Sequence, residues 1–224
     1  MINLLLSSNN FHEEWAKETL KPYFDNRHTV AIIPFSFNRS SIQNDSDWQS
    51  AYHPSFGKYY QSIVTPFIEL GIHEANIRWL NYFTHTSDEM IEMVEGSEII
   101  FLTGGLPDKA VERVIEKGLL DSLNQSQMVI GMSAGALMQL QNYHLSPDKD
   151  YPEFIYSKGL GLLHSDFYIE VHYEETAIQK DCIKKVLAEK ANTVYAISNQ
   201  GGLLIDRNNL HLLGDVITFK GESI

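Results

Sequence analysis

Short apolar runs alternate with longer amphipathic segments over the first 140 residues, and this alternation constrains the fold more than any other feature. The apolar runs, rich in Ile, Val, Leu and aromatic residues, are typical of buried strands. They cover residues 2–6, 29–34, 76–82, 98–103 and 127–131. The amphipathic segments predict helices at residues 13–23, 55–70, 87–95 and 108–123. Apolar strands joined by helices favour a mostly parallel central sheet covered on both faces, which is an α/β three-layer sandwich.

The pattern changes after about residue 140. Residues 141–158 are polar and aromatic with two prolines, and residues 37–57 are rich in Ser, Asn and Asp, so we expect loops in both segments. A strand at 167–171 and a helix at 174–190 are followed by short strands at 194–198, 202–205, 211–213 and 216–219. No repeat, low-complexity tract or linker divides the sequence, so we expect residues 1–224 to form a single domain.

Composition restricts the classes of partner. Acidic residues number 29 against 17 basic ones, a net charge of −12, and this balance disfavours nucleic acids. The single cysteine, Cys182, excludes an intramolecular disulfide and a multi-thiolate metal site, and the histidines form no H-E-x-x-H pattern, so we expect neither metal nor cofactor. Without a membrane-length apolar run or a signal-peptide pattern, we expect a soluble cytoplasmic protein. The sequence leaves open whether it is a monomer or a homodimer.

A Gly-x-Ser-x-Gly pentapeptide, with Ser133 at its centre, directly follows the strand at 127–131 and precedes helix-forming residues. This context is typical of a nucleophile elbow, in which the neighbours of the nucleophile must be small because adjacent backbone approaches closely. The helix that begins there presents free N–H groups to developing negative charge. Ser133 is therefore a candidate nucleophile. The alternative is a glycine-rich turn in which Ser133 only caps a helix.

Gly104 and Gly105 form a second glycine turn, at the carboxyl end of the strand at 98–103. Sites in parallel α/β sheets form outside the carboxyl ends of strands, so the two turns can face one crevice. In that arrangement the N–H groups of Gly105 and Ala134 would hold an oxyanion. The alternative is an ordinary turn with Pro107 in the first turn of the following helix.

A serine nucleophile needs a base and a residue that orients the base. Of the nine histidines, His172 directly follows the strand at 167–171 and precedes a helix, which places it at a carboxyl strand end. Four carboxylates are candidates for the orienting acid: Asp148, Asp150, Glu153 and Glu174. The first three lie between the serine and the histidine in sequence. The last has the H-x-E spacing seen in glutamine amidotransferases.

These segments resemble peptidase family S51, which contains aspartyl dipeptidase (peptidase E) and cyanophycinase and has a class I glutamine-amidotransferase-like fold. The resemblance covers most of the chain and is carried by Leu4-Leu5-Leu6-Ser7, Ala31-Ile32-Ile33-Pro34-Phe35, Thr103-Gly104-Gly105, Gly131-Met132-Ser133-Ala134-Gly135-Ala136 and Val171-His172-Tyr173. It implies that Ser133 is the nucleophile and His172 the general base. Asp148, 15 residues after the serine, matches the dipeptidase spacing and is implied as the acid. The implied activity is dipeptidase-like, serine-type hydrolysis of small peptides.

Two departures from the family pattern bear on function. Leu106 stands where the family's glycine turn usually continues with Asn or a similar polar residue that helps to hold substrate. Basic residues that would receive an N-terminal aspartate are not identifiable either. The sequence therefore leaves two other functions open. One is a catalytically silent amidotransferase-like module that binds a metabolite or a partner, and the other is an esterase, amidase or acyltransferase that uses the same triad.

Overall fold

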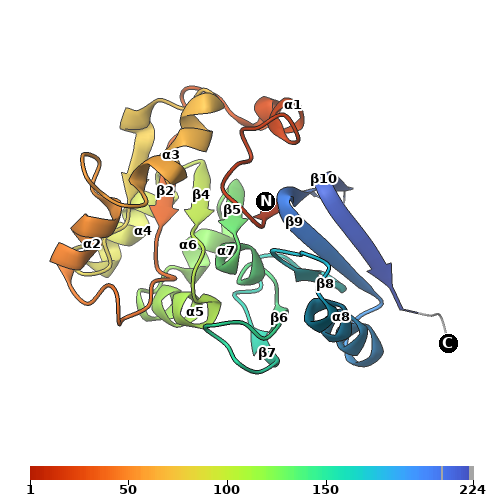
Figure 1. Cartoon of the computed structure of the whole chain (residues 1–224). Coiled ribbons are helices and arrows are strands. Elements are labelled where there is room, and N and C mark those ends of the chain that lie inside the picture. Colours follow the sequence, from red (N-terminus) through yellow and green to blue (C-terminus); the bar gives the residue numbers. More distant parts are fainter. Residues whose placement is uncertain (208, 222–224) are drawn as a thin grey trace.

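A mixed sheet of eight strands forms the centre of the computed structural model, which describes residues 1–207 and 209–221 (Figure 1). Seven strands lie in the order β10-β9-β1-β5-β4-β2-β3, and β8 pairs with another part of β9. The strands are β1 (Ile2–Leu6), β2 (Val30–Ile33), β3 (Ile77–Trp79), β4 (Ile99–Leu102), β5 (Met128–Met132), β8 (Phe167–Glu170), β9 (Thr193–Asp206) and β10 (Asn209–Lys220). The five strands from β1 to β3 are parallel, and β9 is antiparallel to β1 and β10. The predicted mostly parallel α/β sheet is confirmed.

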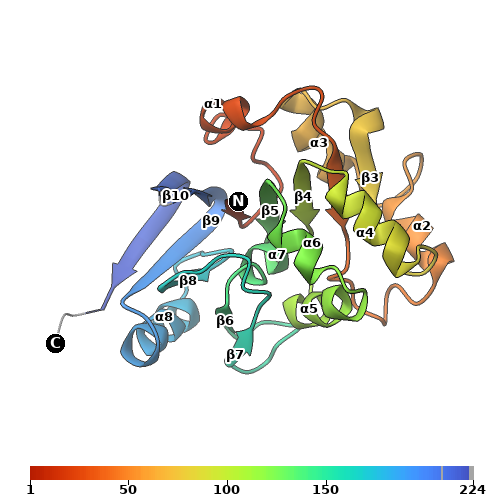
Figure 2. The same cartoon turned by 180° about the vertical axis from the view of Figure 1, so that it is seen from behind.

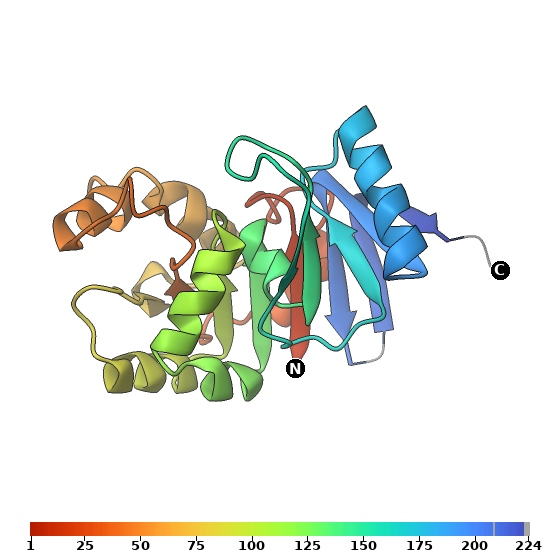
Figure 3. The same cartoon turned by 90° about the horizontal axis from the view of Figure 1, so that it is seen from below.

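Helices lie on both faces of this sheet. They are α1 (Lys17–Leu20), α2 (Asp45–Tyr52), α3 (Tyr60–Glu69), α4 (Ser87–Glu95), α5 (Pro107–Glu116), α6 (Leu120–Asn124), α7 (Ala134–Leu137) and α8 (Ala177–Glu189). Figures 1 and 2 view the sheet from opposite sides: α3 lies in front of it in Figure 1 and α4 in Figure 2. In Figure 3, α8 lies beside β8 and β9. No helix in the described ranges is both long enough and apolar enough to cross a membrane.

The first strand shows why the sheet strands are apolar along their whole length. Successive side chains of a strand point to opposite faces. Leu4 and Leu6 pack into the larger apolar cluster, whereas Leu5 packs with Leu137 and Ile197 into a second cluster. All three leucines are fully buried, and burial of each contributes about 1.5–3 kcal/mol relative to exposure. Two-sided burial therefore fixes β1 at the middle of the sheet.

Several boundaries differ from those expected from the sequence. The loop expected at 37–57 contains α2, which begins where the Asn44 side chain accepts a hydrogen bond from the backbone of Asp47. The helix expected at 13–23 shortens to α1 and a 3-10 turn, and the one at 108–123 divides into α5 and α6. The loop expected at 141–158 contains an antiparallel pair, β6 (Asn142–Leu145) and β7 (Ile155–Lys158).

The four short strands expected near the end of the chain join into two long ones, β9 and β10. The polar run from Ser198 to Gln200 breaks the apolar pattern of β9 but continues its extended backbone, and this part is half-buried or exposed. The interruption in hydrophobicity at these residues is therefore not an interruption in the strand.

Two strands that run in opposite directions, β8 and β1, end beside the middle of β9. The first part of β9 pairs in parallel with β8, so that Glu170 lies opposite Ala196. The later part pairs antiparallel with β1, so that Leu6 lies opposite Gly202. The carboxyl ends of β8 and β1 therefore approach each other across residues 196–202 of β9, and β5 ends beside β1 with Met132 opposite Leu6.

Candidate active site

Ser133 occupies a tight turn between β5 and α7. Its backbone has φ 53° and ψ −113°, a conformation that costs a non-glycine residue on the order of 1–3 kcal/mol. The turn is held because the Ser133 N–H donates to the carbonyl of Leu6 at 2.7 Å. Its neighbours must be glycine: a Cβ on Gly131 would collide with the carbonyl of Gly135, and one on Gly135 would collide with the carbonyl of Leu102. The geometry is that of the predicted nucleophile elbow.

His172 lies just beyond the carboxyl end of β8 and faces Ser133. The strand β8 runs in the opposite direction to β5, which precedes Ser133. Its Nε2 is 2.9 Å from the Oγ of Ser133. His172 also has a positive φ, 52°, and its N–H donates to the Oγ of Ser7 at 3.0 Å. Ser7, the first residue after β1, donates in turn to the carbonyl of Ile197 at 2.7 Å. The structure therefore brings the predicted strand-end histidine within hydrogen-bond distance of Ser133.

The other imidazole nitrogen contacts an asparagine. Nδ1 of His172 is 2.7 Å from the Oδ1 of Asn199, which lies in the middle of β9. The hydroxyl of Ser8 donates to the same Oδ1 at 3.0 Å. Since an amide oxygen can only accept, this arrangement assigns the hydrogen to Nδ1 and leaves the lone pair on Nε2, towards Ser133. That tautomer is the one a general base requires.

The expectation that Asp148 orients the imidazole is wrong. Its Oδ1 accepts the backbone N–H groups of Asp150 at 2.8 Å and Tyr151 at 2.7 Å, and its own N–H donates to the carbonyl of Tyr151. Asp148 thus closes a turn in the segment between β6 and β7, as short polar side chains after a proline commonly do.

The other three candidate acids do not hold the histidine either. Among the described residues, neither Asp150, Glu153 nor Glu174 forms a hydrogen bond or ion pair with His172. Asp150 and Glu174 line a cavity beside the serine, and Glu153 does not. Asn199 is not among the residues predicted from the sequence, because the residue that orients a catalytic histidine is usually a carboxylate. The only sequence signal for Asn199 is a polar run within an otherwise apolar strand.

The glycine turn after β4 packs directly against the elbow. A Cβ on Gly104 would lie 3.2 Å from the Cβ of Ser133. Gly105 has φ 137°, and a Cβ there would collide with the carbonyl of Ser36, so glycine is required. Among the described residues the Gly105 N–H donates to no other backbone group, and the N–H of Ala134, at the start of α7, has no intrahelical acceptor. Two backbone donors are therefore free near Ser133.

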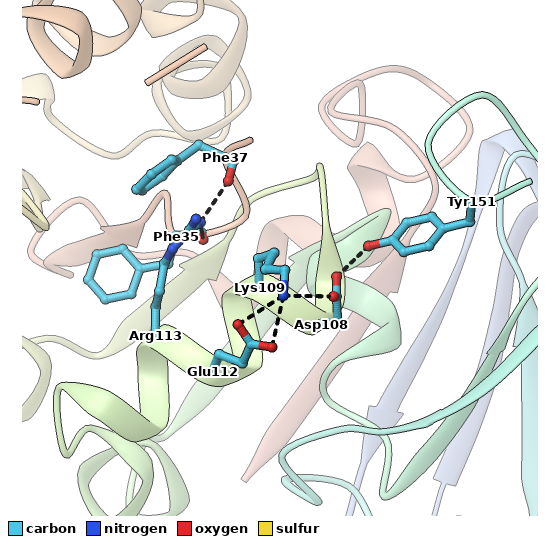
Figure 4. A network of polar contacts seen from close by, with 7 residues as sticks. All are labelled: Phe35, Phe37, Asp108, Lys109, Glu112, Arg113 and Tyr151. Atoms are coloured by element: carbon cyan, nitrogen blue, oxygen red, sulfur yellow. Dashed lines mark hydrogen bonds and ion pairs between the residues drawn. The ribbon is translucent and has the colours of Figure 1, made fainter. Parts of the chain in front are cut away.

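A buried arginine supports this turn (Figure 4). From α5, Arg113 donates to the carbonyls of Phe35 and Phe37, and its guanidinium lies 3.7 Å from the centroid of the Phe37 ring. Burial lowers the pKa of Arg113. Ser36, between the two carbonyls, accepts the N–H of Leu106 at 2.7 Å and donates from its hydroxyl to the carbonyl of Gly104. Arg113 thus fixes the segment against which the glycine turn rests.

Two cavities adjoin the glycine turn, and the first of them is lined by the serine. The first has a volume of about 410 Å³ and is lined by Ser133, His172 and the segment between β6 and β7. The Tyr151 hydroxyl ties that segment to Asp108 of α5 (Figure 4), and burial together with this bond raises the pKa of Tyr151. The second cavity, about 610 Å³, lies on the other side of the glycine turn and includes Leu106. Gly105 and Asp150 line both, so the cavities adjoin at the turn.

No three His, Cys, Asp or Glu side chains within residues 1–207 and 209–221 are grouped so that they could hold a metal ion. Cys182 is a buried free thiol in α8, and burial raises its pKa.

The sheet order, the elbow and the strand-end histidine define a class I glutamine-amidotransferase-like α/β fold. The model of peptidase family S51 matches residues 4–213. The chain therefore belongs to peptidase family S51, a family of serine-type peptidases. No curated protein matches its sequence.

Two solved structures share the fold over nearly the whole chain. A candidate peptidase E protein from Listeria monocytogenes EGD-e is 21% identical with a TM-score of 0.58, and the match covers 98% of each chain. A peptidase from an acI-B1 Actinobacterium is 15% identical with a TM-score of 0.62, and the match covers 99% of this chain and 95% of that one.

Proposed function

We propose that the chain hydrolyses small peptides by acyl transfer to Ser133, with His172 as the general base and Asn199 as the residue that orients it. One observation carries the proposal: Ser133 and His172 meet at 2.9 Å although both must adopt a positive φ to do so. Strain of this kind persists only where surrounding structure enforces it, and it concentrates at functional sites. Membership of a peptidase family supports the same chemistry.

The mechanism follows from the hydrogen-bond directions. Nε2 of His172 takes the proton from Ser133 as Oγ attacks the peptide carbonyl. The N–H groups of Gly105 and Ala134 hold the oxyanion of the tetrahedral intermediate. The imidazolium then gives its proton to the leaving amine, and a water molecule, deprotonated by the same imidazole, releases the acyl group from the serine.

Asn199 does part of what a carboxylate would do. It holds the imidazole ring and fixes the hydrogen on Nδ1, but as a neutral amide it adds no negative charge to stabilise the imidazolium. Cys-His-Asn sites of papain-like proteases use the same combination. We therefore expect a working but slow serine peptidase, and not a silent module.

Small peptides suit the volumes available. The two cavities share Gly105, and the first also contains Ser133 and His172. A residue of substrate on each side of the scissile bond is the simplest occupant, which is the dipeptidase-like action that the sequence predicts.

The test is covalent labelling with a fluorophosphonate probe followed by mass spectrometry. The wild-type chain should be labelled on Ser133, and Ser133→Ala should lose both labelling and peptide hydrolysis while it keeps its fold by circular dichroism. Ser55→Ala, which removes an exposed hydroxyl far from the elbow in sequence, is the matched control and should label normally. A folded wild-type chain that takes no label would favour the catalytically silent binding module. Hydrolysis of esters but of no peptide would favour the esterase alternative.

A further inference from the structure

The cavity beside Ser133, here called the acidic cavity, has a one-sided charge. Four carboxylates line it, and no Lys or Arg does so in the part of the chain that the structure describes: Asp148, Asp150, Glu170 and Glu174. None of the four is paired with a Lys or Arg among those residues. Lys149, although it lies between two of them in sequence, does not line the cavity. Clefts lined by charge of one sign focus potential, so this one attracts cations.

Glu170 is the carboxylate that makes this more than an exposed acidic cluster. Its side chain is only 6% exposed, at the carboxyl end of β8, yet it lines the cavity. Both of its hydrogen bonds end on one oxygen: Oε2 is 2.7 Å from Nε2 of His144 and accepts the hydroxyl of Ser146 at 2.8 Å. No described residue contributes a hydrogen bond to Oε1. Oε1 is not enclosed by protein atoms, so it is open to the cavity and free to accept a hydrogen bond from a ligand.

His144 does not cancel the charge on Glu170. The His144 side chain is fully buried, and its Nδ1 has no hydrogen-bond partner among the described residues. A buried N–H without an acceptor costs about 1–3 kcal/mol, so the favoured tautomer has hydrogen on Nε2 alone. In that tautomer the imidazole donates from Nε2 to Oε2 of Glu170 and leaves Oε1 unengaged.

Apolar side chains form another part of the cavity wall. Leu137, Leu145, Ile169, Val171 and Ile178 contribute to it. A long basic side chain packs its methylene groups on such a surface and places its charged end on a carboxylate.

The position of Glu170 determines how far the charged group of the ligand must lie from the carbonyl that Ser133 attacks. Glu170 precedes His172 by two residues, so their Cα atoms are about 7 Å apart in extended backbone. The α-amino nitrogen of a substrate is only about 2.5 Å from the carbonyl carbon that Ser133 attacks. A charge near Glu170 is therefore better supplied by the end of a long side chain than by the α-amine.

We propose that the acidic cavity binds the basic side chain, Lys or Arg, of the residue whose carbonyl Ser133 attacks. The inference rests on the proposed function for the attack itself. It assigns substrates with a basic residue, not an acidic one, at this position. The lining of the cavity agrees, because it includes no Lys or Arg among the described residues that could bind an aspartate side chain.

The test compares lysyl, norleucyl and glutamyl p-nitroanilides. Norleucine has the same carbon skeleton as lysine without the ammonium group. All three p-nitroanilides carry the same free α-amine, so the contribution of the α-amine to binding cancels in the comparison. We expect kcat/KM for the lysyl substrate to exceed that for the norleucyl substrate about tenfold or more, since hydrogen bonds between charged groups discriminate by about that factor or more. The glutamyl substrate should be the poorest.

Variants distinguish the specific effect of Glu170 from the general effect of the negative charge around the cavity. Glu170→Gln should reduce the lysyl-to-norleucyl ratio of kcat/KM about tenfold. Glu174→Gln, which removes an exposed charge, should reduce the ratio less and in a salt-dependent way. Glu153→Gln and Glu175→Gln are matched controls, because both remove exposed carboxylates that do not line the cavity, and they should leave the ratio unchanged.

A binding measurement keeps the inference testable without turnover. In the Ser133→Ala variant, lysinamide should bind more tightly than norleucinamide by calorimetry, and Glu170→Gln in the same background should abolish the difference. Equal preference for lysyl and norleucyl compounds, or preference for the glutamyl one, would overturn the basic-residue assignment even if Ser133 labels with the fluorophosphonate. Conversely, a failure of labelling with selective lysinamide binding would overturn the peptidase mechanism and leave the cation site standing.

Discussion

Asn199→Asp tests how the imidazole is activated. The substitution is isosteric, and the carboxylate can keep both contacts that Oδ1 now makes, to Nδ1 of His172 at 2.7 Å and to the hydroxyl of Ser8 at 3.0 Å. The change therefore adds one negative charge without moving the ring. Asn199 and His172 are both exposed, so the dielectric at the contact is close to that of water. A charge pair at this 2.7 Å separation is then worth on the order of 1.5 kcal/mol.

That energy acts mainly on the transition state, in which His172 becomes an imidazolium. We expect Asn199→Asp to raise the rate of fluorophosphonate labelling and kcat about tenfold, because about 1.4 kcal/mol corresponds to a factor of ten. The acidic limb of the pH–rate profile should move to higher pH, since the carboxylate also stabilises the protonated imidazole of the free enzyme. Asn199→Ala should slow labelling, because the tautomer is no longer fixed.

Gln200→Glu is the matched control for charge. It places a carboxylate on the neighbouring exposed residue of β9, where it contacts neither member of the pair. This variant should label at the wild-type rate at physiological salt. If Asn199→Asp labelled no faster than wild type, or if Gln200→Glu gave the same gain, the idea that a neutral residue limits this site would be refuted.

Two further predictions concern the glycine turn and alkaline stability. Gly105→Ala should reduce fluorophosphonate labelling about 10²–10³-fold, because its Cβ would collide with the carbonyl of Ser36 and displace an oxyanion donor. The control Gly118→Ala should label normally, because Gly118 also has a positive φ but has open space around it. Equal effects of the two substitutions would contradict the assignment of Gly105. Burial, helped by a hydrogen bond to Glu74, raises the pKa of Tyr60 to about 12. Its folded state therefore keeps the proton that the unfolded chain loses near pH 10, so this contribution is present below pH 10 and lost as pH rises to about 12. Urea titrations should show a smaller loss of stability over that range for Tyr60→Phe, and an unchanged loss would contradict the predicted role.

The sheet, and the placement of Ser133 beside His172, could be predicted from the sequence for the same reason. A strand buried on both faces must be apolar throughout, as at Leu4 to Leu6, and a residue at a carboxyl strand end must face the crevice. Ser133 and His172 meet both criteria, and strand ends can be located from hydrophobicity alone.

Asn199 could not be found by the same reasoning. It lies inside a strand and follows His172 by 27 residues, and it reaches the imidazole only because β9 pairs with β8 on one side of it and with β1 on the other. The sequence carries no marker of that shared pairing. Asp148 met the spacing rule of a family but was used locally, since two backbone N–H groups three residues or less away compete for its carboxylate.

The end of β1 explains why the two strained residues meet at hydrogen-bond distance. Leu6 accepts the N–H of Ser133, and Ser7, the next residue, accepts the N–H of His172. Ser133 and His172 are therefore fixed to consecutive residues at the carboxyl end of β1, the last of the strand and the first beyond it, although they follow strands running in opposite directions. Ser7 is itself fully buried and donates to Ile197, so its hydroxyl connects β1, β8 and β9 at one point. Two residues at positive φ cost on the order of 1–3 kcal/mol each. Anchoring both to the most buried part of the sheet offsets that cost and sets the geometry before any substrate binds.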